Sequence, residues 1–256
     1  MPSAMRRTII LLVLALSGGL LASCGKGGQT AASTSEHAAT ATSSSPTPSA
    51  AITSQQALAF ANAVNLTAAD VPGFTVSSRH GGSDSTGEKR LEREMSQCAG
   101  LAGSAKGIAE ASSKSFQLKH SILDFGVSSE VAVEPSAAQA SRGLAAIRSA
   151  HVRGCFSRYL GAVLKGERFG GPTVGPVTIQ SGTPPAPGAS GSFGWRVTAT
   201  FFVRGIRVPL YLDFLGFVDG PAEVTLLSSG LLQPFPAAVQ QHLFSLLLSR
   251  AEAHRP

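Results

Sequence analysis

Residues 195–226 alternate between apolar and polar side chains with a period of two, which is typical of β-strands that bury one side. The first run ends at Gly205, which permits a tight reversal. A second run covers residues 206–214, and the pair Asp219-Gly220 is a hairpin turn signal before a third strand. The chain is therefore expected to fold around an antiparallel β-meander.

Helical patterns flank the meander and predict a mixed fold. A helix is expected from Ser54, and a closing helix after Pro236 has an apolar side that can cover the sheet. Between them, the capping box Ser136–Gln139 opens another helix. The sequence thus predicts a single α+β domain over residues 55–256, an antiparallel β-sheet with helices packed on one face.

The first 24 residues have the order of a secretory signal. Arg6 and Arg7 precede the apolar run 9–16, which is shorter than the ~20 residues that span a bilayer, so cleavage is the better interpretation. The run is followed by Leu21-Ala22-Ser23-Cys24, which resembles the lipobox of bacterial lipoproteins. The alternative is an ordinary secreted protein whose leader happens to contain a cysteine.

The lipobox resemblance implies a location. In lipoproteins the thiol at the position of Cys24 carries a diacylglycerol and becomes the first mature residue, so residues 1–23 would be the signal peptide. Two or three acyl chains, palmitate among them, would hold the protein stably at the extracytoplasmic face of the cell membrane. Residues 24–54 would then be the lipidated cysteine and a disordered Ser/Thr/Ala/Pro tether, too poor in apolar side chains to order itself.

Cys98 and Cys155 occupy apolar stripes of two expected helices. Lipidation of Cys24 leaves them as the only thiols, and an oxidising compartment would join them. Two buried free thiols or a metal pair are the alternatives, and the lack of a nearby His pair disfavours the metal. We therefore predict a Cys98–Cys155 disulfide.

The chain carries no strong signature of catalysis or of cofactor binding. Without Arg6 and Arg7, 19 basic residues remain against 15 acidic ones, a scattered net charge of +4 that is unlike a nucleic-acid binder. The six histidines include no His-Glu-x-x-His, and no Gly-x-Ser-x-Gly elbow is present. A P-loop-like stretch at residues 82–89 has Glu88 where Lys is required. We expect no cofactor, no metal, no nucleic acid and no enzymatic activity.

Polar side chains of the meander form a possible binding face, for which a solvated sheet face is the plain alternative. Asp213 and Glu223 are also the candidates for a catalytic carboxylate pair, although each alternates with apolar neighbours as a solvent-facing side chain should. The residues of the possible binding face are Arg196, Arg204, Arg207, Tyr211 and Asp213.

Aromatic residues are concentrated in the C-terminal part of the domain. They would line a pocket for an apolar ligand if the helices splayed from the sheet, as in lipid-carrying lipoproteins; a filled core is the default. These residues are Phe193, Trp195, Phe201, Phe214, Phe217, Phe235 and Phe244.

Three C-terminal stretches carry a family resemblance: Arg207-Val-Pro-Leu-Tyr-Leu-Asp-Phe-Leu-Gly-Phe217, Ala222-Glu-Val-Thr-Leu226 and Pro234-Phe-Pro236. They resemble uncharacterised lipoproteins of high-GC Gram-positive type, and the two cysteine segments are loosely similar to extracellular sensor-like domains of that group. The motifs that carry this resemblance are structural, and they imply no active-site residue for this chain. Sensor domains of that kind typically have two disulfides, whereas the sequence allows one here.

These observations leave three functions in order of preference. The first is a membrane-anchored, non-enzymatic binding or sensor-like domain with a protein partner. The second is an envelope carrier of a hydrophobic small molecule, and the third is a hydrolase whose site assembles from dispersed residues.

Overall fold

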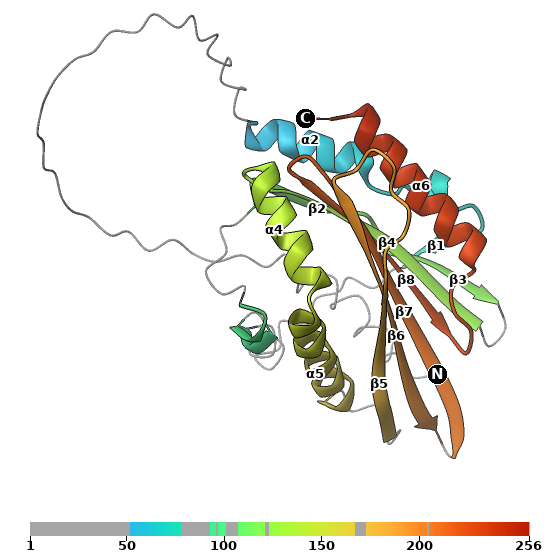
Figure 1. Cartoon of the computed structure of the whole chain (residues 1–256). Coiled ribbons are helices and arrows are strands. Elements are labelled where there is room, and N and C mark those ends of the chain that lie inside the picture. The colour runs from blue at the N-terminus through green and yellow to red at the C-terminus, as the bar shows by residue number, and fades with distance from the viewer. Residues whose placement is uncertain are drawn as a thin grey trace, which may run out of the picture.

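The expected meander forms the centre of one antiparallel β-sheet in the computed structural model (Figure 1). Strand β6 (Gly191–Val203) pairs with β7 (Ile206–Asp219), which pairs with β8 (Ala222–Leu231). Gly205 and Gly220 make the two reversals with φ of +80° and +57°, the left-handed region that glycine adopts without steric strain. The predicted turns are confirmed.

Further strands extend this sheet on both sides. The strand order is β1-β3-β4-β8-β7-β6-β5, and β2 pairs with the same edge of β4 as β3 does. Their bounds are β1 Thr75–Val76, β2 Ala109–Ser112, β3 Phe116–His120, β4 Leu123–Val133 and β5 Thr173–Gly182. The structure describes residues 52–77, 93–95, 97–100, 107–120, 123–166, 173–203 and 205–255.

Helices begin where the sequence provides capping side chains. Thr53 caps the first helix, one residue before the expected Ser54, and its hydroxyl accepts the N–H of Gln56 at 3.2 Å. Ser136 caps the next one as predicted, accepting the N–H of Gln139 at 3.2 Å. The helices include α2 Ser54–Val64, the 3-10 helix Ala68–Asp70, α4 Ala137–Arg148, α5 Ala150–Gly166 and α6 Ala237–Ala253. Residues 93–95 and 97–98 are helical as well. Among the residues described, no helix is both long and apolar enough to span a bilayer.

Helices cover both sides of the sheet, whereas the sequence predicted them on one side. Helices α4 and α5 close the first core, and α2 and α6 close the second (Figure 1). In the first core, the ring of Phe156 on α5 lies 5.4 Å from that of Phe214. In the second, Phe217 lies 5.6 Å from Phe244 on α6. The two layers arise because the central strands are apolar on both sides. The α+β class and the single antiparallel sheet are confirmed.

Polar contacts fix α2 and α6 to each other and to the sheet. Arg250 of α6 donates to both carboxylate oxygens of Asp70, at 2.7 and 2.9 Å, and to the carbonyl of Asn65 at 3.0 Å. Burial alone would raise the pKa of Asp70, but hydrogen bonds from Arg250 and Thr67 outweigh it and lower that pKa. The side chain of Asn65 accepts the hydroxyl of Ser129 on β4 at 2.7 Å. These contacts hold the second helical layer in place.

Candidate functional site

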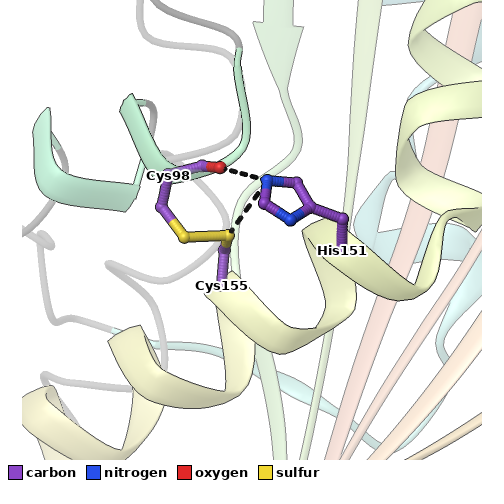
Figure 2. A group of neighbouring side chains, drawn as sticks. All are labelled: Cys98, His151 and Cys155. Atoms are coloured by element: carbon purple, nitrogen blue, oxygen red, sulfur yellow. Dashed lines mark hydrogen bonds between the residues drawn. A yellow bond between two sulfur atoms is a disulfide. The ribbon is translucent and has the colours of Figure 1, made fainter.

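Cys98 and Cys155 are joined by a disulfide, as predicted (Figure 2). Cys155 lies in α5 and is buried, while Cys98 lies in the segment 97–100 and is half-buried. The two cysteines are 57 positions apart in sequence, and their Cα atoms are 5.8 Å apart. The bond therefore ties the segment 97–100 to α5.

A histidine that the sequence did not draw attention to, His151, completes a three-residue group at the disulfide (Figure 2). Its Nε2–H donates to the carbonyl oxygen of Cys98 at 2.5 Å, and Nε2 lies 3.9 Å from Sγ of Cys155. The sulfur atoms and the imidazole nitrogen all lie within 4.8 Å of one another. The signal that could have found it is the spacing His-x-x-x-Cys, because residues four apart share one side of a helix.

Arg158 brings a positive charge to the sulfur atoms. Its Nη2 donates to Sγ of Cys98 at 2.8 Å and lies 3.6 Å from Sγ of Cys155. Cationic N–H groups beside sulfur stabilise a thiolate, which is both the attacking and the leaving group in thiol–disulfide exchange. Arg158 and His151 are exposed, so a reductant can approach. We call Cys98, His151, Cys155 and Arg158 the disulfide cluster.

Two residues of the predicted binding face, Arg196 and Asp213, form an ion pair. Arg196 Nε donates to Oδ1 at 2.6 Å and Nη2 donates to Oδ2 at 2.9 Å, and these hydrogen bonds raise the pKa of Arg196. The expectation that Asp213 faces solvent is wrong, since this residue is only 3% exposed. Helix α6 lies over it, and Gln240 Nε2 donates to Oδ2 at 3.1 Å and to the hydroxyl of Ser228 at 2.5 Å.

The remaining members of that face lie on the same side of β7 as Asp213. Tyr211 is half-buried and pairs in register with Thr198, and Arg207 is exposed near the β6–β7 hairpin. Arg204 lies outside the described residues. Beyond the cover of α6, this side of the sheet carries half-buried Thr198 and Tyr211 together with two exposed residues that pair in register, Arg207 and Phe202. We call it the polar sheet surface and define it by Arg196, Thr198, Arg207 and Tyr211.

The aromatic residues considered for an apolar pocket belong to two different cores. Because the sheet separates the cores, one pocket cannot include all of them. The seven residues therefore do not line a single common pocket. Phe193, Trp195, Phe201 and Phe214 lie in the first core, and Phe217, Phe235 and Phe244 lie in the second.

Glu223 and Asp213 lie on opposite sides of the sheet, so they do not form a catalytic pair. The solvent-facing position expected for Glu223 is wrong too, because the residue is half-buried beneath α4. Gly143 of α4 has no side chain and therefore leaves room for the carboxylate of Glu223. A Cβ at position 143 would collide with that carboxylate. Burial raises the pKa of Glu223 to about 7, and the negative charge of Glu134 adds to the rise.

Glu223→Gln is expected to raise the free energy of unfolding at pH 8 by about 1–2 kcal/mol. The folded-state pKa of about 7 lies above the ordinary 4.5, so the folded protein binds this proton more tightly than the unfolded chain. Wild-type stability therefore falls as pH rises from about 4.5 to about 7, and the loss is complete above that range. The full shift corresponds to at most ~3 kcal/mol, which partial solvation reduces.

Urea unfolding at pH 5 and pH 8 measures this effect. The advantage of Glu223→Gln should be clear at pH 8 and shrink at pH 5. Glu252→Gln, at an exposed position of α6, is the matched control and should follow the wild-type chain at both pH values. A Glu223→Gln variant less stable than the wild type at pH 8 would contradict the account.

Of the arrangements described, the disulfide cluster has the most distinctive chemistry, because it joins a reducible bond to an imidazole and a guanidinium. The polar sheet surface offers hydrogen-bonding groups and one exposed arginine. No protein-family model matches the chain, and no curated protein is significantly similar to it.

Proposed function

We propose that the chain is a membrane-anchored extracytoplasmic lipoprotein whose folded domain is a non-enzymatic binding or sensor-like module. The order of basic, apolar and small residues before Cys24 supports export and lipid attachment. The Ser/Thr/Ala/Pro composition of residues 24–54 supports a tether between the lipid and the domain.

The observation that carries the proposal is the Cys98–Cys155 disulfide. Disulfides persist in oxidising compartments and are rare in the cytosol, so the bond supports a domain outside the cytoplasm. It also accounts for the odd number of cysteines, because the third, Cys24, is left for the lipid.

Cys24→Ala is expected to abolish lipid attachment and to release the protein from the membrane fraction, because the thiol is the acylation site. Cell fractionation measures the release, and the mass of the N-terminal peptide shows whether a diacylglycerol is present. Ser44→Ala, a change in the tether, is the matched control and should remain lipidated and membrane-bound. A Cys24→Ala chain that stays wholly in the membrane fraction would contradict the anchor.

The polar sheet surface supports the binding role. An exposed guanidinium such as that of Arg207 pairs with carboxylates through two parallel hydrogen bonds, and tyrosines such as Tyr211 are enriched in protein interfaces. We infer a protein partner that presents acidic groups. Unchanged cell-surface cross-links after alanine substitution of both residues would contradict this role.

A further inference from the structure

We propose that reduction of the Cys98–Cys155 disulfide creates a site for one Zn²⁺, with Cys98, Cys155 and His151 as ligands. This goes beyond the binding role above and does not depend on the lipid anchor. The site would couple the redox state of the surroundings to metal binding on α5.

The geometry of the cluster fits a single ion. Zn–S bonds of about 2.3 Å and Zn–N bonds of about 2.0 Å place the ligand atoms of a tetrahedral site roughly 3.5–4 Å apart. Nε2 of His151 already lies 3.9 Å from Sγ of Cys155, and all three candidate ligand atoms lie within 4.8 Å of one another. After reduction, the two sulfur atoms have to separate, and the imidazole of His151 has to turn from the Cys98 carbonyl to the ion. Figure 2 shows the imidazole turned toward the disulfide.

Two elements supply the ligands, which makes the site an alternative cross-link. His151 and Cys155 lie one turn apart on α5, and Cys98 comes from the segment 97–100. An ion bound by all three would tie that segment to α5 as the disulfide does now. Metal binding would therefore preserve the connection after the covalent bond is lost.

The charged groups around the cluster favour the protonation state in which cysteine binds zinc, the thiolate. Zinc binds thiolates, and the guanidinium of Arg158, 2.8 Å from Sγ of Cys98, stabilises a negative charge there. His151 must bind as neutral imidazole through Nε2, so its proton moves to Nδ1 and its hydrogen bond to the Cys98 carbonyl is replaced by the metal bond.

The chemistry balances in two steps. A dithiol gives two electrons and two protons to the S–S bond, which yields the thiols of Cys98 and Cys155 and a cyclic disulfide as the oxidised product. Zn²⁺ then replaces the two thiol protons, which are released to solvent. Three protein ligands leave the fourth position to water, so the site is open rather than closed.

Access to the site is adequate for both steps. His151 and Arg158 are exposed and Cys98 is half-buried, so a reductant and an ion can reach the sulfur of Cys98 from solvent. The carboxylate of Asp213, which pairs with Arg196, is less accessible by comparison, because α6 covers it.

The test uses the full chain with Cys24→Ala, in which Cys98 and Cys155 are the only cysteines. A phosphine replaces the dithiol as reductant, because dithiols themselves bind metal. Co²⁺ is titrated as a spectroscopic probe and then displaced by Zn²⁺. The reduced chain should bind one equivalent and show thiolate-to-cobalt charge transfer with the visible bands of tetrahedral Co²⁺; the oxidised chain should show neither.

His151→Ala should weaken metal affinity at least tenfold and alter the visible bands, because loss of even a hydrogen-bonding partner of a metal ligand typically costs roughly 10–100-fold in affinity. His242→Ala, an exposed histidine on α6, is the matched control and should bind as the unsubstituted chain does. Equal affinity and spectrum in His151→Ala would overturn the proposal, as would equal binding by the oxidised chain or no binding after reduction. If reduction abolishes the near-UV circular dichroism, zinc should restore it, and failure to do so also overturns the proposal.

Discussion

The doubly substituted chain Cys98→Ala/Cys155→Ala is expected to have a free energy of unfolding about 4 kcal/mol lower than the wild type. The disulfide joins positions 57 residues apart, and a cross-link of that span restricts the unfolded chain by about this amount. Cys155 belongs to the first core and Cys98 packs against it, so the alanines add a small packing loss. For a domain of this size the melting temperature should fall by roughly 8–16 °C.

Thermal melts of both chains, with and without a phosphine reductant, measure the effect. EDTA is present throughout, so that no metal ion replaces the covalent link. Reductant should lower the melting temperature of the wild type toward that of the variant. The melting temperature of the variant should not change, so the variant is the control for effects of the reductant that do not involve the disulfide. Coincident melting curves for the oxidised wild type and the variant would contradict a stabilising role.

Arg196→Ala is expected to lower the free energy of unfolding by about 2–3 kcal/mol. The side chain of Asp213 is 4% exposed, so loss of the arginine leaves a buried carboxylate with Gln240 as its remaining side-chain donor among the described residues. Removing one partner of a fully buried pair costs about 3–5 kcal/mol. The effect should be smaller here because the side chain of Arg196 is 41% exposed, which gives water a path to the site.

Arg207→Ala is the matched control, since it removes an exposed arginine from the same side of the neighbouring strand. Its effect should stay within about 0.5 kcal/mol. The double variant Arg196→Ala/Asp213→Asn should recover part of the loss, because the buried charge is then absent. Chemical denaturation measures all three, and equal losses for Arg196→Ala and Arg207→Ala would refute the buried-carboxylate explanation.

The two candidate sites lie on opposite sides of the sheet. Helix α5, which carries most of the disulfide cluster, packs on the side of the first core, whereas the polar sheet surface lies on the side that α6 partly covers. A partner bound to one site therefore leaves the other accessible. For a sensor-like module, this separation would allow a redox or metal signal at α5 without displacement of a protein partner.

Local patterns predicted the features that depend on residues close together in the chain. The alternation around Gly205 and Gly220 gave the meander, and Ser136 was correctly placed as a helix cap. The disulfide was also predictable, because few cysteines are present and Cys98 and Cys155 fall on apolar stripes. In each case the deciding interaction is either local or restricted to very few possible partners.

Long-range packing decided the rest. Asp213 and Glu223 both alternate with apolar neighbours, yet α6 covers Asp213 and α4 covers Glu223. A local sequence pattern does not predict which helix will cross which strand. His151 became a candidate ligand only because the segment 97–100 docks beside its helix. The sequence by itself determined the central meander, the helix that Ser136 caps and the cysteine pairing, since the first two depend on neighbouring residues and the third on very few possible partners. The tertiary structure decided which polar groups are buried and which meet, because those depend on contacts between segments far apart in the chain.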